Sequence, residues 1–91
     1  MTASRTESLA WGDALLDEAR SMARCYADAD GRLAEHIHGQ HRRRLRATAR
    51  YYRDAGLGLL AGRVAWLAQR EHVVDAWAKF DRLNAGGCGV A

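Results

Sequence analysis

The chain has 91 residues, a formal net charge of +3 at pH 7 and no proline. A domain of this size buries only a small hydrophobic core, so we expect a partner protein or self-association to complete it. Alanine, leucine and arginine are abundant, and with the absence of proline they favour long helices and argue against a β-sheet.

Charge is distributed unevenly along the chain. Residues 1–35 carry four arginines and seven acidic residues, for a net charge of −3, whereas residues 36–63 carry seven arginines and only Asp54, for a net charge of +6. Residues 64–91 carry three basic and three acidic residues. We therefore expect either that the acidic and basic segments face each other within one fold, or that the basic segment faces a polyanion.

The first predicted helix begins at a capping residue, Ser4 or Thr6, with Glu7 in its first turn. Apolar and small residues recur every three or four positions, which predicts one helix face. This face comprises Trp11, Leu15, Ala19, Met22, Tyr26, Ala29 and Leu33. Both Gly31 and Gly39 are candidates for the turn that follows.

The second predicted helix begins near Gly39 and Gln40. Its apolar face has the same spacing and comprises Leu45, Ala49 (or Thr48), Tyr52 and Gly56, while most of the arginines occupy the other face. Residues 55–58, Ala-Gly-Leu-Gly, predict either a turn between helices or small residues that let a neighbouring helix approach closely.

The last predicted helical segment runs from Leu57 to Leu83 and has two adjoining apolar strips, so we expect it to contact more than one neighbour. The strips comprise Leu60, Val64, Leu67 and Val74, and Trp66, Val73, Trp77 and Phe80. Residues 84–89, Asn-Ala-Gly-Gly-Cys-Gly, predict a helix cap followed by a tail.

Together these patterns predict an all-α fold of two or three antiparallel helices, arranged as a helical hairpin or small bundle and completed by a partner or by dimerisation. We expect a flexible N-terminus at residues 1–6, one helical domain at residues 7–84 and a flexible glycine-rich tail at residues 85–91. The apolar stripes are too wide for an isolated hairpin. Trp66, Trp77 and Phe80 are therefore predicted to be anchors for a partner or a second copy.

The segment HRRRLRATARYYRD, residues 41–54, raises the hypothesis of polyanion binding. Arginine contacts phosphate through a planar fork, and Tyr51 and Tyr52 could stack on bases. The candidate residues are Arg42, Arg43, Arg46, Arg50 and Arg53. The alternative is a solvated face, or a face paired with acidic residues of the first helix and the following turn. These acidic residues are Asp13, Asp17, Glu18, Asp28 and Glu35.

The segment EHIHGQH, residues 35–41, raises the hypothesis of a metal site. Glu35, His38 and His41 are spaced three apart, and Glu-x-x-His is the spacing used in carboxylate di-iron bundles. Glu18 on the first helix would be a fourth ligand, and a dimer would complete the set. The alternative is a group of polar residues near a turn.

Catalytic chemistry is not indicated elsewhere. No serine–histidine–acid arrangement and no phosphate-cradling glycine loop is evident, so we expect no enzyme and no cofactor. Cys25 and Cys88 are predicted to be free thiols. No signal peptide and no membrane span are evident, so we expect a cytoplasmic protein.

Residues 33–60, LAEHIHGQHRRRLRATARYYRDAGLGLL, resemble the small helical-hairpin E component of type III secretion needle chaperones. Gly39-Gln40-His41 matches the turn of that family, and Gly56-Leu57-Gly58-Leu59-Leu60 matches its apolar run of small residues. The resemblance implies a non-enzymatic hairpin that docks on a helical-repeat co-chaperone and keeps the needle subunit from polymerising. It also implies contact positions at Leu45, Tyr52, Leu59 and Leu60.

The leading hypothesis is therefore an adaptor or chaperone that buries an apolar helix face against a partner protein. The alternatives are a nucleic-acid-binding protein that uses the arginine helix and a metal-binding helical dimer.

Overall fold

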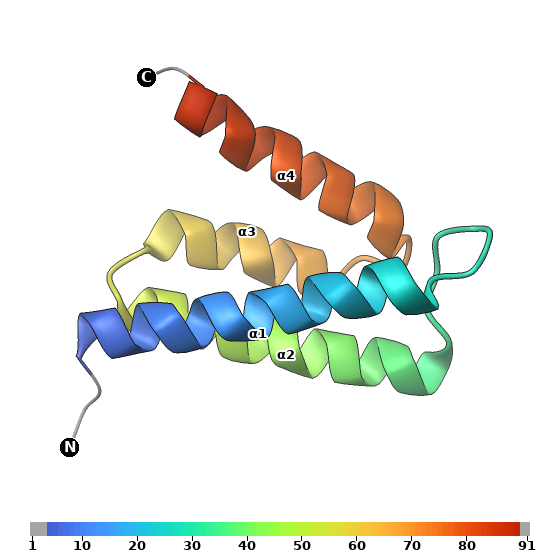
Figure 1. Ribbon diagram of the computed structural model, residues 1–91, viewed down its shortest axis with the longest axis horizontal. Coiled ribbons are helices and arrows are strands. Elements are labelled where there is room, and N and C mark those ends of the chain that lie inside the picture. Colours follow the sequence, from blue (N-terminus) through green and yellow to red (C-terminus); the bar gives the residue numbers. More distant parts are fainter. Residues whose placement is uncertain (1–3, 90–91) are drawn as a thin grey trace.

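The chain folds into a bundle whose described part contains four α-helices and no β-strand (Figure 1). The computed structural model describes residues 4–89 and the side chains of residues 4–85. The helices are α1 (Arg5–Tyr26), α2 (Glu35–Asp54), α3 (Gly58–Ala68) and α4 (Val73–Gly89). The predicted all-α class is confirmed, but the predicted count of two or three helices is wrong, because the Leu57–Leu83 segment is broken at residues 69–72.

Successive helices run in opposite directions, and α1 and α2 lie side by side along most of their length (Figure 1). Helix α4 crosses the other helices at an angle, and its C-terminal end diverges from α3. The principal extents are 41, 35 and 18 Å, so the bundle is about two helices thick. None of the described helices is long and apolar enough to cross a membrane.

Helix α1 begins after Ser4, one of the two predicted caps, whose side chain accepts a hydrogen bond from the Glu7 N–H at 3.1 Å. Its buried face coincides with the predicted one only in part, at Ala19. The residues it buries are Ser8, Gly12, Ala19 and Ala23. Trp11 and Tyr26, which belong to the predicted stripe, are 59% and 61% exposed. Small residues face the bundle because they let α1 approach α2 closely.

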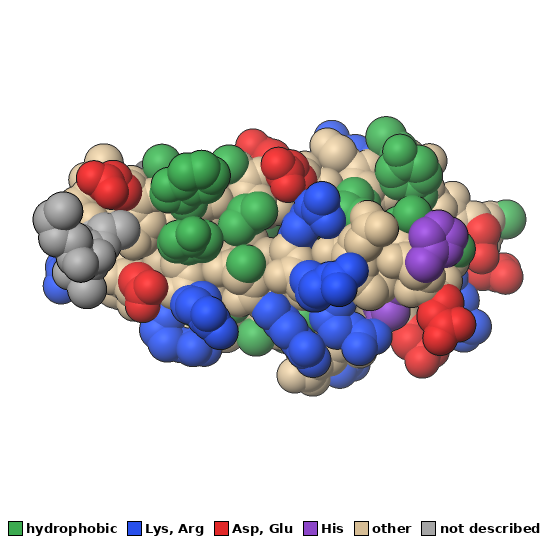
Figure 2. Space-filling model, turned by 90° about the horizontal axis from the view of Figure 1, so that it is seen from below, with side chains coloured by type: hydrophobic (Ala, Val, Ile, Leu, Met, Phe, Trp, Pro, Cys, Tyr) green, Lys and Arg blue, Asp and Glu red, His purple; other side chains and the backbone are tan. Residues whose placement is uncertain are grey.

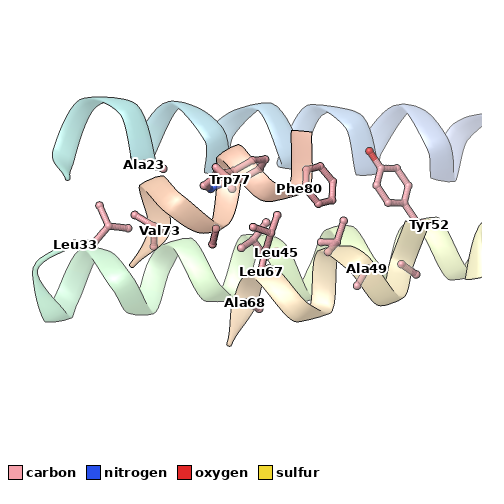
Figure 3. Close-up of a cluster of buried hydrophobic side chains, with 14 residues drawn as sticks. Ala23, Leu33, Leu45, Ala49, Tyr52, Leu67, Ala68, Val73, Trp77 and Phe80 are labelled. Atoms are coloured by element: carbon pink, nitrogen blue, oxygen red, sulfur yellow. The ribbon is translucent and has the colours of Figure 1, made fainter. Parts of the chain in front are cut away.

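Gly12 lies where α1 packs tightly against Tyr52 of α2. A Cβ atom at this position would lie 2.8 Å from Cε1 of Tyr52 and 2.9 Å from its Cδ1. Tyr52 reaches from α2 towards α1 (Figure 3) and its hydroxyl donates to the Asp13 carboxylate at 2.5 Å. Burial and this carboxylate raise the pKa of Tyr52 well above its ordinary value. Gly12 therefore provides the space that the Tyr52 ring occupies.

The first two turns lie at Gly31 and Gly56, which adopt φ values of +79° and +84° that favour glycine. In the first turn the Asp28 carboxylate accepts hydrogen bonds from the N–H groups of Arg32 and Asp30, which lower the pKa of Asp28. These bonds explain why α1 ends at Tyr26. The Gly39 turn that the needle-chaperone resemblance implies is absent, since Gly39 lies within α2.

Both predicted termini contain helical residues. Arg5 and Thr6 belong to α1 although residues 1–6 were predicted to be flexible, because the Ser4 cap starts the helix early. Helix α4 continues to Gly89, through part of the predicted tail at residues 85–91, since no proline interrupts it. Residues 1–3 and 90–91 lie outside the described residues.

The core lies between all four helices (Figure 3). Among residues 73–85 of α4, whose side chains the structure describes, those in the core come from the start of the helix and are Val73, Ala76, Trp77 and Phe80. The indole N–H of Trp77 donates to Nε2 of His41 on α2 at 3.0 Å. Arg20 of α1 lies over the indole ring, with its Cζ 4.6 Å from the ring centroid. Its guanidinium also binds the Asp81 carboxylate of α4 at 2.6 Å. The start of α4 is thus fixed in the bundle.

We predict that Gly12→Ala destabilises the protein by about 1–3 kcal/mol, because the added methyl group displaces the Tyr52 ring. Replacing glycine by alanine at a helix position where the methyl group meets no neighbour stabilises the fold instead. Gly39→Ala is the matched control, since a Cβ there meets nothing within 4 Å, and we expect it to stabilise by about 0.5–1 kcal/mol. Urea unfolding of both variants measures the difference. Equal stabilisation by the two would show that α1 and α2 are not closely packed at Gly12.

Candidate functional site

The structure divides the predicted partner-contact residues between the core and the surface. Four of them are buried in the core: Leu45, Tyr52, Trp77 and Phe80. Of these, Phe80 also lines a surface groove between α3 and α4. The chain packs these large side chains against its own helices. The other three are accessible. Leu59 is 72% exposed, and Leu60 and Trp66 are half-buried.

An apolar groove runs between α3 and α4, where α4 diverges from the bundle. Its cavity volume is about 370 Å³. Its lining comprises Gly58, Leu59, Gly62, Arg63, Trp66, Lys79, Phe80 and Leu83. We name it the α3–α4 groove. The Nη1 atom of Arg63 donates to Oδ1 of Asn84 at 2.9 Å, and Lys79 Nζ lies 5.4 Å from the Trp66 ring centroid. Two cationic side chains therefore lie beside an apolar surface.

The sequence did not indicate Leu83 or Gly62 as site residues. Leu83 is 45% exposed, although its apolar character marked it only as the end of a helix. Gly58 and Gly62 are four residues apart on α3, and a Cβ at either meets nothing within 4 Å. This four-residue spacing is the sequence feature that could have indicated the groove, because it places two glycines on one helix face.

Five of the six arginines of α2 gather on one face. We name Arg42, Arg43, Arg46, Arg50 and Arg53 the arginine stripe. Arg42 is half-buried and the other four are exposed. Figure 2, which views the molecule from below, shows basic side chains in a row along this side. The tyrosines do not accompany them as predicted: Tyr52 is buried, and Tyr51 is half-buried at a different angle around α2.

Pairing of the basic segment with the acidic first helix is limited. Arg44 binds Glu18, with Nε 3.1 Å from the carboxylate oxygen. Asp13 accepts from the Tyr52 hydroxyl instead of from an arginine. Within residues 4–85, no carboxylate lies within 4 Å of a stripe guanidinium nitrogen.

The predicted metal ligands Glu18, Glu35, His38 and His41 are not brought together. Glu18 is engaged by Arg44, and His41 is 1% exposed with its Nε2 accepting from Trp77. In the part of the chain that the structure describes, no three or more His, Cys, Asp and Glu side chains form a group that could hold a metal ion. The single chain therefore does not assemble the predicted site, because helix packing directs His41 inwards and Glu18 towards an arginine.

Burial makes His41 a neutral acceptor. Desolvation, and then the neighbouring His38, lower the pKa of His41 to about 4. The ring centroids of the two histidines are 6.4 Å apart. Neutral His41 carries its proton on Nδ1, because Nε2 accepts the Trp77 N–H. Nδ1 has no hydrogen-bond partner among the described residues.

Cys25 is a free and exposed thiol at the end of α1. The side chain of Cys88 lies outside the described residues.

The chain matches no family model, no curated protein and no solved structure.

We predict that stability falls as the pH is lowered from about 6.5 to about 4. In this range the unfolded chain protonates His41, while the folded protein keeps it neutral, so protons favour unfolding. The full loss from this group is about 3 kcal/mol, and it levels off below about pH 4. Urea unfolding measured across this range gives the dependence.

The His41→Gln variant isolates this effect, because glutamine can accept the Trp77 N–H but does not titrate. We expect its stability to depend less on pH than that of the unaltered protein. The control is His36→Gln, which replaces an exposed histidine on the same helix and leaves the Trp77 contact in place. An unchanged slope in His41→Gln would show that His41 is not buried as a neutral group.

Proposed function

We propose that this protein is a small non-enzymatic interaction module that binds an amphipathic helix of a partner protein in the α3–α4 groove. The observation that carries the proposal is Leu59, which is 72% exposed beside Trp66 and Phe80 in this groove. Burying an exposed leucine side chain contributes about 1.5–3 kcal/mol. A partner that covers the groove therefore gains this energy without unfolding any part of the core.

The lining of the groove defines the chemistry of the partner. Two facing helices with apolar side chains suit a third helix whose apolar residues recur at positions i, i+3, i+4 and i+7. Arg63 and Lys79 stand beside the apolar surface, so acidic residues next to the apolar stripe would complement them. Gly58 and Gly62 leave the α3 backbone accessible, which allows close approach of the partner helix.

The resemblance to needle-chaperone E components offers a specific form of this proposal. In that form the partner is a helical-repeat co-chaperone, and the pair keeps a needle subunit from polymerising. The accessible positions Leu59 and Leu60 support it, because they belong to the matched apolar run. The buried positions Leu45 and Tyr52 do not contribute to it.

The test compares two exposed apolar positions. Leu59→Glu places a charge in the groove, whereas Tyr26→Glu places one at the end of α1, where the residue is 61% exposed. Neither residue belongs to the core, so both variants should remain folded, which circular dichroism checks. Each tagged protein is purified from its own host without high-salt washes, and its complexes are weighed by native mass spectrometry.

We expect the unaltered protein and Tyr26→Glu to retain one stoichiometric protein partner that Leu59→Glu loses, with a weakening of at least tenfold in a titration with the purified partner. The partner's contact segment should be an amphipathic helix with acidic flanks. If every variant is isolated as the bare chain, or if both substitutions release the partner equally, the groove is not the binding surface.

A further inference from the structure

The arginine stripe occupies a narrow arc of α2. At about 100° of rotation per residue, its five side chains fall within an arc of about 100° around the helix axis. From Arg42 to Arg53 the stripe extends about 16 Å along that axis. The stripe is therefore a compact straight row of cations and is not spread around the helix.

Nothing in the described part of the chain neutralises this row. The ion pairs formed by arginine link Arg20 to Asp81, Arg32 to Glu71 and Arg44 to Glu18, and none involves a stripe residue. Glu35 and Glu71 lie near Arg42 in a shared pocket at the N-terminal end of α2, but at no ion-pair distance from it. The row thus carries up to five positive charges that an external anion can neutralise.

The chemistry of the row favours phosphates of a duplex nucleic acid. Arginine holds phosphate oxygens through a planar fork, and a DNA duplex carries about one phosphate charge per 1.7 Å of its axis, so the row faces a dense array of phosphates. The arc includes no aromatic side chain on which unpaired bases could stack, since Tyr52 is buried against Asp13. It also includes no asparagine or glutamine, so the contacts would be to the backbone and not to base edges.

A membrane surface fits less well. A helix that lies on an anionic bilayer inserts its apolar face between the lipids. The apolar face of α2, with Leu45 and Ala49, is buried in the core and cannot insert. We propose that the arginine stripe is a binding surface for the phosphate backbone of a duplex nucleic acid, independent of its sequence. This surface is separate from the α3–α4 groove and goes beyond the protein-interaction role.

The experiment measures binding of the full chain to a fluorescent 20-base-pair duplex between 50 and 200 mM NaCl. With four phosphate contacts, we expect the affinity to fall roughly 100-fold over this range. The double variant Arg46→Ala/Arg50→Ala should lose about two contacts, so its affinity should fall only about tenfold over the same range. It should also bind more weakly than the unaltered protein at 50 mM NaCl.

The matched control is Arg24→Ala/Arg82→Ala, which removes the same charge from exposed positions on α1 and α4. We expect this control to keep the salt dependence of the unaltered protein. Alanine preserves helix propensity in both pairs, and circular dichroism verifies folding.

Three outcomes would overturn the proposal. The first is absence of duplex binding at 50 mM NaCl. The second is an equal loss in the two double variants, which would assign binding to overall charge and not to the stripe. The third is preferential binding of phosphatidylserine vesicles or polyglutamate over the duplex at equal anion concentration, which would assign the surface to a membrane or to an acidic protein.

Discussion

The hydrogen bond from the Trp77 indole to His41 is the contact on which the arrangement of the C-terminal half depends. It joins the start of α4 to the centre of α2 across the core, at 3.0 Å between nitrogen atoms. Because both groups are buried, losing either partner leaves a polar atom without a hydrogen bond in the interior, at a cost of about 1–3 kcal/mol. This bond also requires His41 to stay neutral, and it removes the Nε2 atom from use as a metal ligand.

The same contact explains the open groove. Trp77 and Phe80 hold only the first part of α4 against the bundle, and Arg20 reinforces that attachment through Asp81. Beyond this point α4 diverges from α3 (Figure 1), so Leu59 and Leu83 do not cover each other. The exposed leucines are therefore a consequence of where the core of α4 ends. Helix α2 shows a similar division, since one of its faces carries Tyr52 and Leu45 in the core and another carries the exposed arginines.

Sequence patterns predicted the fold class and one helix cap correctly but not the packing. The composition indicated helices, and Ser4 with Glu7 indicated the start of α1, because both are local properties of the chain. Periodicity identifies a helix face without showing which neighbour covers it. This is why Trp77 was assigned to a partner when α1 and α2 cover it. On α1 the large residues Trp11 and Tyr26 suggested the wrong face, because close packing against Tyr52 requires the small residues.

The candidate surfaces were predictable to different extents. The spacing of the arginines already placed most of them on one face of a helix, although only the structure shows that Glu18 pairs with Arg44 and leaves the stripe unpaired. The groove was not predictable, because it depends on the angle at which α4 leaves the bundle. That angle follows from the contacts of Trp77 with residues far away in the sequence.

The most direct test of this account is methyl NMR of leucine-labelled protein in the presence of a soluble paramagnetic agent. In the free protein, Leu45 and Leu67 should be closed to solvent in the core, whereas Leu59 and Leu83 should be open to it in the groove. We therefore expect strong broadening of the Leu59 and Leu83 methyl signals and protection of those of Leu45 and Leu67, which are at most 1% exposed. Protected Leu59 methyl groups, or broadened signals from Leu45, would contradict both the core and the groove described for this protein.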